Sequence, residues 1–320
     1  QVTHDFAGAL SEAQTLYKED PRQAQALATI GDSQLELGDY MGAAKSYREL
    51  ETLSRGPAIT ARLAHLAWLQ GDAVQAEKLA RQAHDEAGTA GTTGAGLGWY
   101  DYLAGMIAFQ AGDLAEAARW YNAAAADWPD SYLVLASQGR LAAADGRTDD
   151  AIALYHRAIA VTPQPDALAA LGDLYQLTGQ TKLAEQQYAT VRVIAQLAAV
   201  NQQVYNRQLV LFDVNHGTDL AEALRLAERE LVVRKDIYGY DAYAWALLAN
   251  GRAAEADRAM AQALSLGTRD AQLFYHAGLI AQAVGDEARA RTLLNDALAL
   301  NPGFDPLGAA RARAALEALR

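Results

Sequence analysis

Small and apolar residues recur along the chain at a spacing that predicts pairs of packed helices. In the clearest copy, residues 99–129, Gly105 is followed by Ala117 after 12 residues, Tyr121 after 16 and Pro129 after 24. A small residue on each of two antiparallel helices lets their backbones approach closely. We expect the aromatic residue, one turn further on, to fill the space toward the next pair. The same offsets recur at Gly31, Ala43 and Tyr47; at Gly139, Ala151, Tyr155 and Pro163; at Gly172, Ala184 and Tyr188; and at Gly278, Ala290, Leu294 and Pro302.

Glycine, aspartate and proline mark the ends of these predicted helices. Several helical runs are each followed by a glycine, which suits the left-handed position after a helix. These glycines are Gly38, Gly71, Gly112, Gly146, Gly179, Gly251 and Gly285. Aspartates that can cap the next helix follow directly at Asp39, Asp72, Asp113 and Asp286. All seven prolines fall at junctions between units, which avoids the cost of about 3 kcal/mol for a proline inside a helix. The pattern therefore predicts a string of helix–turn–helix units.

This spacing resembles that of the tetratricopeptide repeat (TPR), whose pattern is W-x2-L-G-x2-Y, then A-x3-F, then P. Such units stack on one another because a single pair cannot bury its apolar faces alone. The resemblance covers nearly the whole chain. It implies an all-α fold, a right-handed TPR superhelix (α-solenoid) of about eight helix–turn–helix repeats plus terminal capping helices. We expect the repeats to start near residues 24, 57, 98, 132, 165, 204, 237 and 271.

Three stretches depart from the repeat. Residues 1–21 align with the second helix of a unit, so we expect a partial N-terminal repeat. The Gly- and Thr-rich run 87–98 interrupts the period and is expected to be a flexible loop. Residues 306–320 are expected to form a C-terminal capping helix with the polar outer face that a terminal unit needs. No linker divides the chain, so residues 1–320 are expected to form a single solenoid.

Composition argues against some classes of function but does not identify the function. The formal net charge is -12 and no basic run occurs, which argues against a nucleic-acid partner, because binding a phosphate backbone needs clustered Lys and Arg. No apolar run approaches the roughly 20 residues that span a bilayer, so we expect a soluble protein without direct membrane insertion. The chain starts at Gln1, which leaves a removed signal peptide open, and with it a cytoplasmic or an exported location.

The sequence contains no recognised catalytic or metal-binding pattern. It has no cysteine, and its six histidines lack the pair spacing of an H-E-x-x-H zinc site. A G-x-S-x-G elbow and a phosphate-binding loop are also absent. We therefore expect no cofactor, no metal and no enzymatic activity. Carboxylates are plentiful, and two of them could form a catalytic pair between helices. The least favoured alternative is therefore that the chain is an unrecognised hydrolase or transferase.

The resemblance also implies where a partner would bind. In TPR proteins the first helices line the concave face, and positions 2, 5, 9, 12 and 13 of each unit usually point into it. On this chain these positions hold two groups of mainly aromatic residues with an arginine between them. The expected binding residues are His65, Trp68, Trp99, Tyr102, Met106 and Phe109, then Arg140, then Tyr205, Phe212, Tyr238, Asp241, Trp245 and Tyr275.

The sequence thus predicts a non-enzymatic scaffold that binds a protein or peptide in its concave groove, since Tyr and Trp are favoured binding anchors. The other interpretation of these aromatics is packing within the groove or against the next unit. The basic residues with which some TPR proteins grip a C-terminal carboxylate are missing from the corresponding positions, Ala28, Asp32, Ala61 and His65. The alternative function is a structural subunit that associates with itself or joins a larger complex, such as an envelope assembly.

Overall fold

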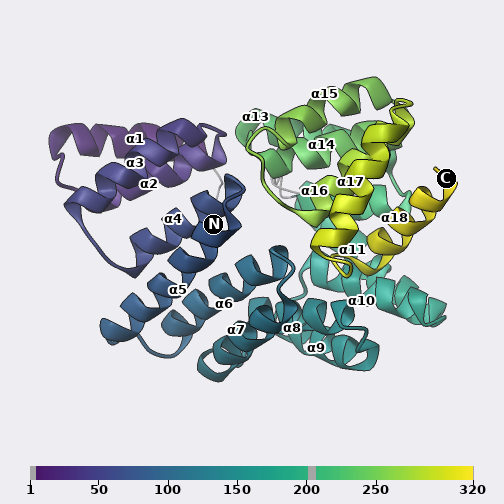
Figure 1. The fold of residues 1–320 in the computed structure, drawn as a ribbon, viewed down its shortest axis with the longest axis horizontal. Coiled ribbons are helices and arrows are strands. Elements are labelled where there is room, and N and C mark those ends of the chain that lie inside the picture. The colour runs from purple at the N-terminus through teal and green to yellow at the C-terminus, as the bar shows by residue number, and fades with distance from the viewer. Residues whose placement is uncertain (1–4, 201–206, 320) are drawn as a thin grey trace.

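The computed structural model describes residues 5–200 and 207–319, and every regular element within them is a helix. The helices follow one another as antiparallel pairs along a curved path (Figure 1). They are α1 (Phe6–Glu19), α2 (Ala24–Glu36), α3 (Tyr40–Leu53), α4 (Pro57–Leu69), α5 (Ala73–Thr89), α6 (Ala95–Gln110), α7 (Leu114–Asp127), α8 (Tyr132–Ala144), α9 (Thr148–Val161), α10 (Pro165–Leu177), α11 (Thr181–Val200), α12 (Arg207–His216), α13 (Leu220–Val233), α14 (Ile237–Ala249), α15 (Ala253–Ala263), α16 (Ala271–Ala283), α17 (Glu287–Leu300) and α18 (Pro306–Ala318).

The even-numbered helices from α2 to α16 are the first helices of the pairs, and each packs on the odd-numbered helix that follows it. Six of them begin at the residues from which the repeats were counted: Ala24, Pro57, Tyr132, Pro165, Ile237 and Ala271. The start expected near residue 204 lies outside the described residues. The predicted caps are confirmed, because the side chains of Asp39, Asp72, Asp113 and Asp286 each accept a backbone N–H in the first turn of a second helix.

The space beside the small residues of the repeat is filled by the aromatic residue of the same helix pair. A Cβ added at Gly105 would lie 2.5 Å from the Tyr121 ring, and one added at Gly31 or Gly172 would also overlap the tyrosine of its pair. The ring lies over the glycine of its own pair and also packs toward the next pair, as expected, because Tyr121 shares a cluster with Leu141 of α8 and Tyr155 shares one with Leu171 of α10.

The prediction of a flexible loop over residues 87–98 is wrong for most of that stretch. Helix α5 continues to Thr89 and α6 begins at Ala95, which leaves only residues 90–94 between them. Ala87 is fully buried. A Cβ added at Gly98 would lie 2.8 Å from Cβ of Trp128. The small residues here therefore allow close packing between helices rather than a mobile connection.

The two halves of the solenoid come back into contact (Figure 1). The turns at Gly38, Gly71 and Gly112, each after a first helix of the N-terminal half, meet backbone of the C-terminal half. An added Cβ would overlap the carbonyl oxygens of Lys235, Gly267 and Leu300 respectively. The Asn301 side chain donates to the Phe109 carbonyl at 3.1 Å. These contacts between turns close the superhelix on itself.

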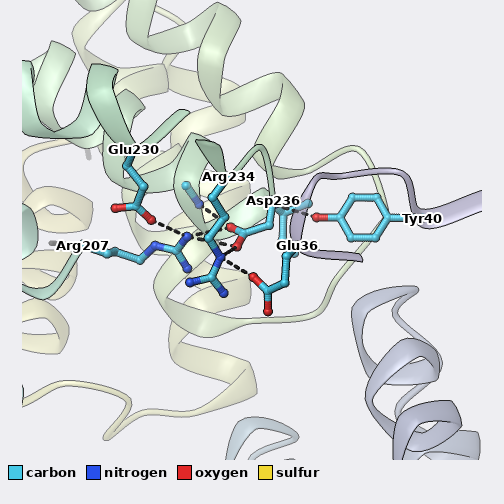
Figure 2. A network of polar contacts seen from close by, with 8 residues as sticks. Glu36, Tyr40, Arg207, Glu230, Arg234 and Asp236 are labelled. Carbon is cyan, nitrogen blue, oxygen red and sulfur yellow. Dashed lines mark hydrogen bonds and ion pairs between the residues drawn. The ribbon is translucent and has the colours of Figure 1, made fainter. Parts of the chain in front are cut away.

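A cluster of buried charges reinforces this closure at one point (Figure 2). The clasp, as we name it, consists of Glu36, Tyr40, Arg207, Glu230, Arg234 and Asp236. Arg207 pairs with both Glu230 and Asp236 at 2.8 Å, and Arg234 pairs with Glu36 and Asp236. The Tyr40 hydroxyl accepts a hydrogen bond from the Ile237 N–H at 2.8 Å. Because Glu36 and Tyr40 belong to the first pair and the others to α12–α14, the clasp joins segments about 200 residues apart.

Burial opposes ionisation inside the clasp. Desolvation raises the pKa of Glu36 and of Glu230, although the charges of Arg234 and Arg207 act against this rise. The clasp is accompanied by apolar contact, since the largest hydrophobic cluster contains Trp68 and Ile107 as well as Ile237, Leu273 and Ile280. The closure therefore rests on a shared core as well as on ion pairs.

Candidate functional site

Two adjoining cavities lie beside the first helices of the solenoid. The outer chamber, of about 640 Å³, lies among α2, α4 and α6. The inner chamber, of about 340 Å³, lies among α6, α8 and α10, with α16 and the start of α18 on its opposite side. Tyr102 and Met106 on α6 border both chambers. The two chambers therefore meet at α6.

The outer chamber has aromatic residues at its rim, and the charged residues Arg62 and Asp32 in its wall pair with each other. Trp99 stands at the rim with 42% of its surface exposed, and its ring meets that of Tyr100 edge-on at 5.1 Å. Two nitrogens of Arg62 bond the two Asp32 carboxylate oxygens, each at 2.8 Å. Burial lowers the pKa of His65, so this imidazole is neutral near pH 7. The outer chamber therefore offers mainly apolar and aromatic contact.

Tyrosines dominate the inner chamber. Tyr102 and Tyr121 lie with their ring centroids 6.5 Å apart, and Tyr132 and Tyr155 line the same cavity. Burial raises the pKa of Tyr102, Tyr121 and Tyr155, while the nearby positive charge of Arg140 acts against this rise. These phenols are therefore neutral at physiological pH and can donate hydrogen bonds.

Arg140 is the basic side chain of the inner chamber, and its position is fixed from two sides. Its guanidinium carbon lies 4.5 Å from the centroid of the Phe109 ring. One terminal nitrogen donates to the Phe304 carbonyl at 3.1 Å. Phe304 comes from the segment that enters α18, so Arg140 takes part in the contact between the two halves of the solenoid.

Three carboxylates also line the inner chamber, and each has a hydrogen-bond donor. Asp173 accepts from the Tyr188 hydroxyl at 2.7 Å and pairs with Nε2 of His216 at 2.8 Å. Asp305 accepts from the Gly308 N–H and so caps α18. Asp166 is exposed and accepts from the Ala167 N–H at 2.9 Å. Burial raises the pKa of Asp305, a rise that the Gly308 N–H opposes.

The structure brings together several of the residues expected at the binding surface. Tyr102, Met106, Phe109 and Arg140 line the inner chamber, and His65 and Trp99 line the outer one. Trp68, Phe212, Asp241, Trp245 and Tyr275 are instead buried in the core. Tyr238 is half-buried, and its hydroxyl accepts from Trp68 Nε1 at 3.4 Å. Tyr205 lies outside the described residues.

The C-terminal aromatic group couples neighbouring helices. Trp245 stacks on His276 with ring centroids 4.2 Å apart and an interplanar angle of 15°. Nδ1 of His276 lies 2.8 Å from Asp241, so this aspartate has a partner inside the core. Trp245 also donates to Asn215 at 2.9 Å. These contacts join α12, α14 and α16, and they explain why this group does not line a chamber.

Sequence positions alone missed several residues of the inner chamber, among them Tyr132, Tyr155, Phe304 and Asp305. Tyr155 was identified as a packing residue of a second helix, and its ring also reaches the chamber wall. Phe304 and Asp305 arrive through closure of the solenoid. No rule based on the position within one repeat could have found these two, because they line the cavity from about five repeats away.

The fold was compared with known proteins. No family model matches the sequence, and no curated protein sequence matches it. BtubC (BKLC) from P. vanneervenii is similar in structure at 21% identity and a TM-score of 0.50, over 61% of this chain and 89% of that one. The human IFIT1 dimer with PPP-AAAA is similar at 15% identity and a TM-score of 0.52, over 93% of this chain and 69% of that one.

A tetratricopeptide repeat protein from Parabacteroides merdae is also similar, at 20% identity and a TM-score of 0.40, over 82% of this chain and 98% of that one. This chain has an all-α solenoid fold similar to those of BtubC and IFIT1. The predicted all-α solenoid is therefore confirmed.

Two further searches concern chemistry and membranes. Within residues 5–200 and 207–319, no three His, Asp or Glu side chains are grouped so that they could hold a metal ion. Across the same ranges, no helix combines the length and the apolar character that crossing a bilayer requires.

Proposed function

We propose that this chain is a non-enzymatic scaffold that binds a peptide segment of a protein partner inside its outer and inner chambers. The observation that carries the proposal is that the two chambers share Tyr102 and Met106 as lining residues, so that one partner segment could contact both. Aromatic rings and a fixed arginine are the side chains that most often anchor a partner. Here Trp99 stands at the rim and Arg140 at the inner end.

The size of the chambers favours a short segment over a folded domain. Cavities of about 300–1,000 Å³ enclose a ligand of drug-like size, and both chambers fall in this range. A short extended or helical segment with apolar side chains fits such a space. A partner would therefore insert a loop or a terminus.

A nucleic-acid partner is less favoured. The human IFIT1 structure holds PPP-AAAA, which raises RNA as a candidate for this chain as well. Phosphate binding relies on several Lys and Arg side chains acting together. The inner chamber instead has Asp166, Asp173 and Asp305 around Arg140, so we favour a peptide.

A random peptide library displayed on phage tests this function. Synthetic copies of the selected peptides should bind the wild-type chain, and a Tyr102→Ala/Met106→Ala variant should bind them about 10-fold more weakly, because it removes the surface that both chambers share. Calorimetric titration measures the affinities, and circular dichroism checks that helicity is kept. Met41→Ala/Val74→Ala is a matched control on exposed side chains. Failure to select any peptide, or equal affinity for all three proteins, would contradict the proposal.

One observation favours self-association as a second candidate. Val193, Leu197 and Val200 on α11 are 52%, 57% and 80% exposed, and their spacing places them along one face of the helix. Such an apolar stripe is a typical helix-docking surface. If it joins two copies, light scattering should give a mass that rises with concentration, and Val193→Asp/Leu197→Asp should return the protein to a monomer. A monomer at every concentration would exclude this candidate.

A further inference from the structure

We infer that the inner chamber takes a carboxylate group and that Arg140 is its counter-ion. This inference rests on the proposed function, because it names the chemistry that a partner presents at the inner end of the same interior. The carboxylate can come from the partner peptide, as a side chain or a C-terminus, or from a free carboxylic acid. The two sources share one chemistry and are separated by the experiment below.

The contacts of Arg140 leave its guanidinium group able to bind an anion. Its guanidinium lies on the Phe109 ring and one terminal nitrogen is held by the Phe304 carbonyl. Arg140 makes no ion pair with any carboxylate in the two described ranges. Arg140 lines the inner chamber. A guanidinium presents its donors as a planar fork that matches the two oxygens of a carboxylate.

Other arginines of the interior differ from Arg140 in this respect. Arg62 pairs with Asp32, Arg207 with Glu230, and Arg234 with Glu36. Removing a charge from water is unfavourable unless a partner compensates it. The half-buried Arg140 directly contacts a ring face and a carbonyl, whereas Asp270 and Asp305 act on it only through their charge and form no ion pair with it. An incoming carboxylate would supply the missing partner.

The acidic residues of the chamber do not take this role. Asp173 already bonds His216 and Tyr188, and Asp305 is committed to the N-terminus of α18. Tyr132 and Tyr155 line the same space and carry hydroxyl groups that can act as further donors. A single carboxylate suits this setting better than a doubly charged phosphate, because the three aspartates repel added negative charge.

The experiment uses the full chain and two sets of probes. The first set is a library-selected peptide as free acid, as C-terminal amide, and with each internal Asp or Glu replaced by Asn or Gln. The second set is 4-phenylbutyrate and its uncharged amide. Arg140→Gln removes the charge, Arg140→Lys keeps it but removes the planar fork, and Arg157→Gln is a matched control on the exposed face of α9.

We expect removal of one carboxylate from the peptide, or Arg140→Gln, to weaken binding about 10- to 100-fold, as for the loss of a charge-assisted hydrogen bond. Arg140→Lys should fall between, and Arg157→Gln should match the wild type. Binding of 4-phenylbutyrate but not of its amide to the wild-type chain would support the inference without relying on any variant. If no peptide binds but 4-phenylbutyrate does, the proposed function fails and the carboxylate site stands. Equal affinity for all acid and amide probes would overturn the inference, even with the function intact.

Discussion

At the scale of single residues, glycines that look alike in the sequence have different surroundings in the closed molecule. Gly112 and Gly146 both follow a first helix, with φ of 84° and 75°. A Cβ added at Gly112 would overlap the Leu300 carbonyl oxygen, whereas one added at Gly146 would meet nothing within 4 Å. Sequence identified both as helix terminators. It could not show that only Gly112 touches the far half, because that contact depends on the curvature of the whole solenoid.

This pair separates backbone strain from closure. We expect Gly146→Ala to lower the free energy of unfolding by about 1–2 kcal/mol, the cost of a left-handed conformation for alanine. Gly112→Ala should cost about 1–3 kcal/mol more, because its methyl group also overpacks the contact with Leu300. Urea unfolding followed by circular dichroism measures both. Equal losses would mean that the turn at Gly112 does not touch the opposite half in solution.

At the scale of elements, buried Asp–His pairs join neighbouring helices. Asp173 on α10 pairs with His216 on α12, Asp241 on α14 with His276 on α16, and His84 on α5 with Asp101 on α6. Burial lowers the pKa of His216, and the positive charge of Arg311 also lowers it. The hydrogen bond and the charge of Asp173 raise this pKa, as does the hydrogen bond to the Phe212 carbonyl. The raising effects are larger, so the pKa of His216 is raised overall. The folded chain therefore holds a proton on His216 more tightly than the unfolded chain does.

A pH-dependent stability follows from this raised pKa. The contribution of protonated His216 is complete below the unfolded pKa of about 6.5 and disappears as the pH rises through the higher folded pKa. We expect the wild type to lose about 1.5 kcal/mol more between pH 6 and pH 8 than His216→Gln, an amount typical of a hydrogen bond to a charged group. Urea unfolding at the two pH values measures the difference. Parallel losses in both proteins would show that His216 does not carry this effect.

The elements themselves were largely predictable, since their signals are local. The aspartate caps and most first-helix starts agree with the repeat. The stretch 87–98 was mistaken for a loop because Gly and Ala give the same signal in a flexible segment and in a closely packed helix. Only the partner surface, here Trp128 against Gly98, distinguishes the two.

At the scale of the whole molecule, closure decides which concave residues are free. Tyr102, Met106 and Arg140, which hold concave positions of their repeats, border the inner chamber. Trp245 and Tyr275 occupy equivalent positions but are buried by the segments that pack against them. A rule based on one repeat treats all concave positions alike. It could not foresee that the two ends of the solenoid would meet, nor that Phe304 would complete the inner chamber.

The central claim is that the solenoid closes on itself and thereby completes its inner chamber, which Phe304, Asp305 and Pro306 line from the far half. The chain has no cysteine, so Met41→Cys and Val232→Cys add two unique labelling sites. Both side chains are exposed, at 80% and 77%, and they flank the clasp residues Tyr40 and Arg234.

Pulsed electron–electron double resonance between spin labels at these two sites measures the closure directly. We expect one narrow peak at short distance, because Tyr40 bonds Ile237 and Glu36 pairs with Arg234 in the clasp between them. The peak should broaden toward longer distances when Arg234→Ala breaks the clasp. A broad distribution at long distance in the unmodified clasp would show an open superhelix and would contradict an inner chamber that both halves line.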